Sequence, residues 1–174
     1  ARSKGRPGGA LVTAWPGATT VVTARTDALM ASIPIVCLTG QVPTHLIGND
    51  AFQECDTVGI TRPCTKHNWL VRDVNDLSRI IHEAFYVART GRPGPVVVDI
   101  PKDVQFATGT YTGPKDVRHK TYQPRVKGDP TAIAHAVELM SRAEEPPLYT
   151  RAGVIHSGPQ ANLPFREPVR LPDV

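Results

Sequence analysis

Short apolar runs alternate with stretches of helical spacing between residues 10 and 106, and no other feature constrains the fold as strongly. The runs Ala10–Thr13, Ile35–Leu38 and Pro95–Ile100 are bounded by glycine and proline, which is typical of buried strands, and Lys66–Val71 is a further candidate. Strands that alternate with helices pair in parallel and carry helices on both faces of the sheet. We therefore predict an α/β fold with a doubly wound parallel sheet.

Two helices are predicted between these strands. One covers about Ala18 to Ala31, and the other covers Val74–Arg89 with Asp73 as its N-cap. Apolar residues of the second helix fall at helical spacing and form its inner stripe, while its charged residues form the solvent face. The inner stripe is Leu77, Ile80, Ile81, Ala84 and Ala88, and the solvent face is Asp76, Arg79, His82, Glu83 and Arg89.

The alternation stops at Phe106, and glycine, threonine, proline and charged residues dominate as far as Gly128. This composition is typical of a linker between domains. Asp129 and Pro130 then begin another helix as N-cap and first residue, and Leu148–Thr150 is predicted to be a strand of a second α/β domain. We predict a partial first domain at 1–106, a linker at 107–128 and an incomplete second domain at 129–174.

Composition excludes several classes. Lys and Arg are scattered over a chain of net charge +4, so a nucleic-acid surface is not expected, whereas small acidic molecules suit the same bias. The three cysteines have no CxxC spacing, which disfavours a disulfide framework and a zinc site and favours a reducing compartment. No run is long enough to span a membrane and the N-terminal residues lack the apolar stretch of a signal peptide, so we predict a cytoplasmic protein.

A polar segment, Gly40–Glu54, follows the Ile35–Leu38 strand directly. Ligands of open α/β sheets bind where loops leave the carboxyl ends of strands, and this loop carries an aromatic ring and an amide, at Phe52 and Gln53. Lys102 follows the Pro95–Ile100 strand in the same way. Connecting loops are polar in any case, so the residue types alone leave both interpretations open. His45 and His67 lack an HxH or HExxH frame, and we predict no metal site there.

Four motifs match one known family in order and spacing. They are Gly40-Gln-Val-Pro-Thr-His-Leu-Ile-Gly48, Asp50-Ala-Phe-Gln-Glu54, Thr65-Lys-His-Asn68, and Gly91-Arg-Pro-Gly-Pro95 followed by Pro101-Lys-Asp103. Together they resemble the acetohydroxyacid synthase (acetolactate synthase) large subunit, a thiamine-diphosphate-dependent enzyme. The resemblance covers residues 10 to about 160, the later half of that family's pyrimidine-binding domain and the first stretch of its central domain.

The resemblance implies an enzyme that condenses pyruvate with pyruvate or 2-oxobutyrate, with loss of CO₂, in valine, leucine and isoleucine biosynthesis. It implies the cofactors thiamine diphosphate, Mg²⁺ and FAD, association with other catalytic subunits and a possible small regulatory subunit. Gln53 and Ser32 would lie near thiamine diphosphate, and Arg92 would contact FAD. Phe52, Pro43, Ala51, Lys66 and Lys102 would line the substrate channel.

The sequence departs from the family pattern at several positions. Trp15 and Thr20 replace the glycine and asparagine of a Gly-Pro-Gly-Ala-Thr-Asn turn, and Arg151 and Ala152 stand in the central domain's glycine run. The stretch holding the family's activating glutamate and its metal-binding domain are not matched. We therefore expect no retained catalytic residue, no metal ligand and no activity from this chain alone.

Two alternatives stay open on the sequence. The first is a related thiamine-diphosphate enzyme, such as a pyruvate oxidase, a glyoxylate carboligase or a 2-oxo acid decarboxylase. The second is a non-catalytic module that pairs with intact subunits.

Overall fold

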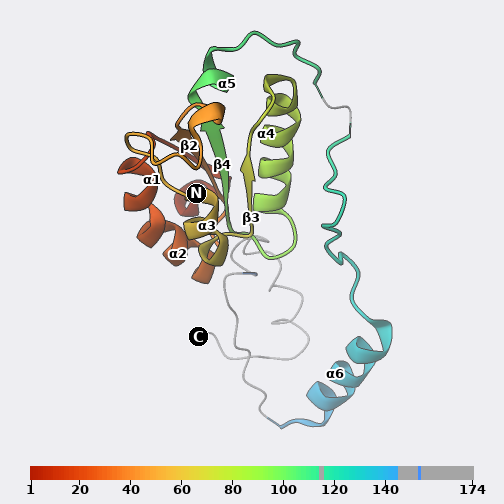
Figure 1. Ribbon diagram of the computed structural model, residues 1–174. Coiled ribbons are helices and arrows are strands. Elements are labelled where there is room, and N and C mark those ends of the chain that lie inside the picture. The colour runs from red at the N-terminus through yellow and green to blue at the C-terminus, as the bar shows by residue number, and fades with distance from the viewer. Residues whose placement is uncertain (114–115, 145–152, 154–174) are drawn as a thin grey trace. The chain divides into compact units, whose positions relative to one another are not determined.

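The computed structural model describes residues 1–113, 116–144 and 153. These residues include a sheet of four parallel strands in the order β1-β2-β4-β3 (Figure 1). All three strand pairings are parallel, which confirms the predicted α/β class. The strands are β1 (Gly8–Val12), β2 (Ile35–Gln41), β3 (His67–Leu70) and β4 (Pro95–Pro101).

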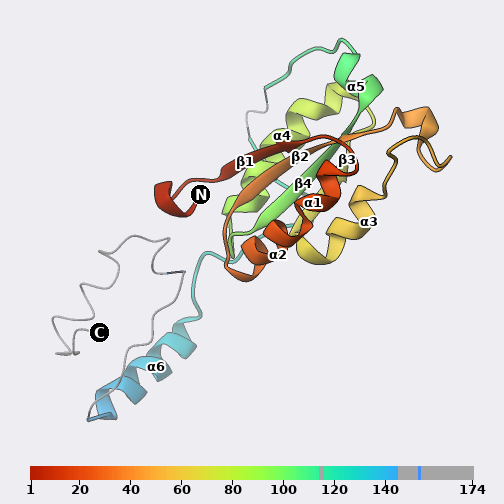
Figure 2. The same cartoon turned by 90° about the vertical axis from the view of Figure 1, so that its left-hand side faces the viewer.

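Helices cover both faces of this sheet (Figures 1 and 2). The long helix α4 packs on one face against β2, β3 and β4, and three shorter helices lie on the other. A further short helix, α5, follows β4 without an intervening loop. The helices are α1 (Gly17–Thr20), α2 (Val22–Met30), α3 (Thr57–Thr61), α4 (Val74–Arg89) and α5 (Lys102–Phe106), with 3-10 turns at Arg2–Lys4, Thr44–Leu46 and Arg62–Cys64.

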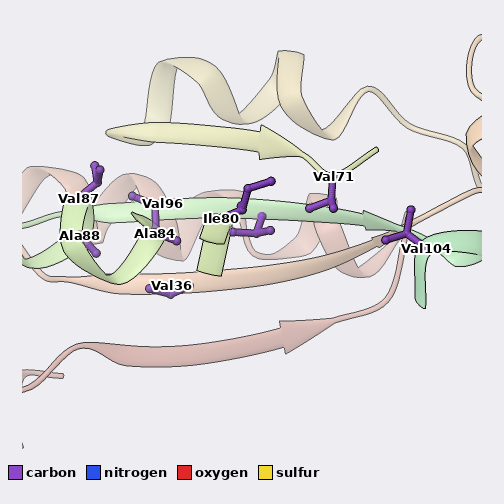
Figure 3. Packing of buried hydrophobic residues seen from close by; sticks show 9 residues of the cluster. Val36, Val71, Ile80, Ala84, Val87, Ala88, Val96 and Val104 are labelled. Atoms are coloured by element: carbon purple, nitrogen blue, oxygen red, sulfur yellow. The ribbon is translucent and has the colours of Figure 1, made fainter. Parts of the chain in front are cut away.

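The apolar core lies between α4 and the sheet (Figure 3). Val36 pairs with Val96 across β2 and β4, and both side chains face the small residues of the predicted inner stripe of α4. Burying each such valine stabilises the fold by about 1.5–3 kcal/mol. β4 is central, with Val96, Val97 and Val98 all 0% exposed, which explains why its sequence is an unbroken β-branched run.

The helix predicted over Ala18–Ala31 is divided in the structure. α1 ends at Thr20, and α2 begins at Val22. The hydroxyls of Thr19 and Thr20 both donate to the carbonyl of Pro16, at 2.8 and 2.9 Å. Side-chain bonds of this kind compete with the regular helical pattern. The helices α3 and α5, which the sequence did not predict, have only five residues each and show no helical period.

The prediction that Glu83 lies on the solvent face of α4 was wrong. Asp73 does cap the helix, its side chain accepting from the Asn75 backbone N–H, and His82 is exposed as predicted. Glu83 is buried, and Arg79 one turn earlier donates to its Oε1 at 2.9 Å. The ion pair satisfies the carboxylate at the border of the apolar stripe, so a charged residue is tolerated there.

The chain divides into two compact units, 1–124 and 125–174. Part of the predicted linker belongs to the first unit, because the Tyr122 hydroxyl donates to the carbonyl of Thr90 at 2.6 Å. In the second unit, α6 (Pro130–Arg142) begins at the predicted N-cap Asp129, which accepts from Thr131 N and Ala132 N. The predicted strand Leu148–Thr150, Arg151 and Ala152 lie outside the described residues. None of the helices in the described part is long and apolar enough to cross a membrane.

Candidate functional site

A cleft of about 1030 Å³ opens at the carboxyl edge of the sheet. The ends of β1, β2 and β4 form its floor, and two segments form its walls: α5 and residues 42–55, which we call the cleft loop. The position is the one at which open α/β sheets bind ligands. Its lining residues are Leu11, Val12, Thr13, Ala14, Thr39, Gly40, Gln41, Val42, Pro43, Leu46, Ala51, Phe52, Gln53, Ile100, Lys102, Gln105 and Phe106.

The cleft brings together five of the eight residues to which the sequence assigned a role. Pro43, Ala51, Phe52 and Gln53 come from the cleft loop, and Lys102 comes from the first turn of α5, about 50 residues later. Thr44 and Asp103 join these two walls: the Thr44 backbone N–H donates to Asp103 Oδ1 at 3.0 Å, and its hydroxyl donates to Oδ2. These donors lower the pKa of Asp103, the Thr44 hydroxyl most strongly.

Gln53 has a backbone conformation that non-glycine residues seldom adopt, with φ at 61°. A glutamine in this left-handed region costs roughly 1 kcal/mol or more, so its surroundings must hold it there. Glu54 provides that restraint, because its carboxylate accepts from the backbone N–H groups of Gly48 and Ala51 and closes the tip of the loop. Both bonds lower the pKa of Glu54, Gly48 contributing most.

Among the described residues that line it, the mouth of the cleft is apolar and carries one cation, Lys102. Phe52 and Phe106 are 88% and 79% exposed, although large apolar side chains are usually covered. Lys102 is exposed, and its ammonium has no hydrogen-bond or ion-pair partner among the described residues. An apolar surface with a single free cation suits a small organic anion that is partly removed from water.

At the floor of the cleft, β1 and β2 come close together. A Cβ atom on Gly40 would lie 3.2 Å from the backbone nitrogen of Ala14, tighter than ordinary packing. A side chain here would push apart the ends of the two strands. Glycine at this position therefore keeps the floor narrow.

A buried polar layer lies beneath the cleft loop. Asp99 of β4 is 1% exposed and accepts from the Thr39 hydroxyl at 2.5 Å and from Gln41 Nε2 at 3.0 Å. Burial raises the pKa of Asp99 to about 6, although these two donors and the charge of Arg25 favour its ionised form. Sequence analysis did not single out Gln41 or Asp99 as functional. The available signal was Asp99 itself, one carboxylate within the run Pro95-Val-Val-Val-Asp-Ile100.

Lys66, by contrast, does not line the cleft. It precedes β3, so it lies at the amino edge of the parallel sheet, where its backbone N–H donates to the carbonyl of Pro95 at the start of β4. Its ammonium donates to the carbonyls of Val87 and Thr90 and to the Tyr122 hydroxyl. Lys66 thereby satisfies carbonyls at the end of α4, where a cation also complements the helix dipole.

Ser32 and Arg92 meet each other at this same amino edge. Arg92 Nε donates to Ser32 Oγ at 2.8 Å, and Arg92 Nη2 donates to the carbonyls of Leu29 and Met30. The guanidinium therefore ties the end of α2 to the turn before β4. Any contact of Arg92 with FAD would add to these bonds or replace them.

The cleft fits one of the implied cofactors in its donor chemistry. A planar heterocycle such as the aminopyrimidine of thiamine diphosphate suits apolar walls with an amide, Gln53, at one side. The described residues contain no group of three His, Cys, Asp or Glu side chains that could hold a metal ion.

The sequence of this chain is similar to those of known thiamine-diphosphate enzymes. Residues 1–60, which include β1, β2 and the whole cleft loop, match the family model "Thiamine pyrophosphate enzyme, N-terminal TPP binding domain". The chain is 44% identical to the acetolactate synthase large subunit of Buchnera aphidicola over 99% of its own length and 31% of that protein. The chain is homologous to part of the acetolactate synthase large subunit.

Other synthases are equally similar. The acetolactate synthase of Arthrospira platensis is 47% identical over 94% of the chain, and the Escherichia coli isozyme 3 large subunit is 45% identical over 91%. The chain spans less than a third of the length of these curated relatives, 28% in both cases. The predicted family and fold class are confirmed, and the individual site residues stay predictions.

Proposed function

We propose that this chain forms one wall of an acetolactate synthase active site, and that the cleft at the carboxyl edge of its sheet is that wall. The reaction would join pyruvate to pyruvate or to 2-oxobutyrate with loss of CO₂, in branched-chain amino-acid biosynthesis. The observation that carries the proposal is the convergence of Phe52, Gln53 and Lys102, from two segments far apart in sequence, on one apolar cleft.

Each of these side chains has a role that its chemistry suits. The Gln53 amide would hydrogen-bond the cofactor's aminopyrimidine or a substrate carboxylate. Phe52 would exclude water and shape the space for the second 2-oxo acid, and Lys102 would attract its carboxylate. Pro43 and Ala51 would complete the channel wall. Thiamine diphosphate, when bound, supplies the decarboxylation and carbon–carbon bond formation.

The remaining components of the proposal come from the relatives. Mg²⁺ would be held by residues other than those described here, and FAD would lie near Arg92 with a structural role. The name "large subunit" of the E. coli relative is consistent with a smaller regulatory partner, and other catalytic subunits would supply the opposite wall of the cleft. A reducing compartment such as the cytoplasm suits the free thiols of Cys37, Cys55 and Cys64.

A graft tests the proposal. Residues 8–112 would replace the corresponding stretch of the E. coli isozyme 3 large subunit, and acetolactate formation from pyruvate would be measured with all three cofactors present. We expect turnover from the graft and a loss of roughly tenfold or more in kcat/KM in its Gln53→Asn variant. Asparagine tolerates the left-handed backbone but withdraws the amide by one methylene, so the variant isolates the reach of that group.

A folded graft without activity contradicts the proposal. Thermal unfolding of the graft beside the unmodified host enzyme establishes whether it has folded. The 174-residue chain alone serves as the second control, and we expect no acetolactate from it.

A further inference from the structure

Both ends of the cleft loop are attached to one buried side chain, that of Gln41. Its Oε1 accepts from the backbone N–H of Val42, the first residue of the loop, at 2.9 Å. Its Nε2 donates to the carbonyl of Cys55, the last residue of the loop, at 2.8 Å. Gln41 and Val42 are buried, so the Val42 N–H has little access to water if the amide is withdrawn, whereas the Cys55 carbonyl also accepts from the Thr57 backbone N–H at 2.8 Å.

The two bonds require one orientation of the amide. If the group turned over, its NH₂ would face the N–H of Val42, and its oxygen would face the carbonyl of Cys55, so both bonds would be lost. Asp99 distinguishes the two orientations, because its Oδ2 accepts from Nε2 at 3.0 Å and would repel the amide oxygen. The other oxygen of Asp99 is held by the Thr39 hydroxyl, which keeps the carboxylate in place.

We propose that Asp99 is a positioning residue of the cleft: it fixes the amide of Gln41, and through it the loop that carries Phe52 and Gln53. The effect of Asp99 on ligand binding rests on the function proposed above, whereas the effect of Asp99 on the conformation of the cleft loop does not. Gln41 lines the cleft, but its amide and the carboxylate of Asp99 are both hydrogen-bonded within the protein.

The charge on Asp99 reinforces the orientation that the two backbone bonds already favour. A protonated carboxyl group could donate to the amide oxygen of Gln41, so Asp99 itself would no longer distinguish the two orientations, and only the bonds to Val42 and Cys55 would do so. Burial raises the pKa of Asp99 to about 6, so Asp99 contributes fully to this selection only above that pH.

The charged groups that act on Asp99 are Arg25 of α2, which favours its ionisation, and Asp56 before α3, which opposes it. Burial raises the pKa of the Cys37 and Cys55 thiols, and the charge of Asp99 adds to both increases.

Hydrogen exchange of the full chain tests the proposal without any enzymatic activity. In Gln41→Glu, at pH 7.5, a carboxylate oxygen replaces the donating NH₂ and faces both Asp99 and the carbonyl of Cys55. We expect the Val42 amide and the rest of the cleft loop to exchange roughly tenfold faster or more, while amides of β4 keep their protection. Gln123→Glu makes the same change at an exposed position and should leave both regions as they are.

Two further measurements separate positioning from general stability. In the parent chain, protection of Val42 relative to β4 should fall as the pH drops below about 6, and this dependence should vanish in Asp99→Asn. In the double variant Gln41→Glu/Asp99→Asn the new amide at position 99 can donate to the carboxylate at position 41, so protection of Val42 should recover in part.

Equal loss of protection in the loop and in β4 of every variant would overturn the proposal, since it would indicate unfolding alone. Unchanged loop exchange in Gln41→Glu, or a pH dependence that persists in Asp99→Asn, would overturn it as well. If exchange changes as expected but the graft makes no acetolactate, the proposed function fails and the positioning role of Asp99 stands.

Discussion

Asp99 alone is expected to lower the free energy of unfolding by about 2 kcal/mol as the pH rises from about 4 to about 7. Burial raises the pKa of Asp99 to about 6, above the value of about 3.9 for an unfolded chain. Between these values the folded state binds more protons than the unfolded state. Stability is therefore greatest below the unfolded pKa and is lost as the pH rises through the folded one.

The measurement is urea unfolding of the parent chain and of Asp99→Asn across this pH range. Subtracting the free energy of unfolding of one chain from that of the other leaves the contribution of Asp99. Groups that titrate in the opposite sense cancel, such as His67, whose pKa is lowered mainly by desolvation. We expect the free energy of unfolding of the variant to rise by about 2 kcal/mol relative to that of the parent over the range. A difference that stays constant with pH contradicts a carboxyl group ionising in the buried layer.

Arg25→Met is expected to raise the free energy of unfolding by roughly 1–3 kcal/mol. Arg25 is 2% exposed, and only one of its nitrogens is engaged, Nη2 with the carbonyl of Ala18 at 2.6 Å. Its Nε and Nη1 are buried without a hydrogen-bond partner among the described residues. A buried cation with unsatisfied donors is destabilising, whereas methionine keeps most of the apolar stem and fits irregular space.

The comparison is best made near pH 5. Asp99 is mainly protonated at that pH, so removing the charge of Arg25 takes away little electrostatic stabilisation of its carboxylate. Urea unfolding of the two chains gives the difference directly. Arg6→Met, at an exposed position, is the matched control and should leave stability within about 0.5 kcal/mol. A loss of stability in Arg25→Met would show that the charge of Arg25 is compensated in the folded chain.

Sequence reasoning succeeded where one periodic signal governed the structure. The apolar run of β4 and the apolar stripe of α4 each predicted an element. The alternation of strands with helices along the chain predicted that the strands pair in parallel. The helix over Ala18–Ala31 was predicted as one because threonine hydroxyls that bond the Pro16 carbonyl leave no mark on apolar spacing. Glu83 was misplaced because its ion pair with Arg79 outweighs the usual preference of a charged residue for water.

For the cleft, sequence order predicted part of the arrangement. Residues that directly follow β2 and β4 had to share one edge of a parallel sheet, so Phe52, Gln53 and Lys102 could be grouped in advance. Lys66 could not be separated from them by motif alone, because a motif does not specify on which side of a strand its residues fall. The tie from Asp99 through Gln41 depends on strand register, Thr39 opposite Asp99, which only the structure supplies.

The most direct test of the carboxyl-edge site compares Lys102→Met with Lys66→Met in the graft, by the KM for pyruvate. Both substitutions remove one ammonium group, but Lys102 lines the cleft whereas Lys66 satisfies carbonyls at the other edge of the sheet. We predict that Lys102→Met raises KM roughly tenfold, and that Lys66→Met leaves KM unchanged while lowering the melting temperature. An increase in KM confined to Lys66→Met would contradict a site at the carboxyl edge.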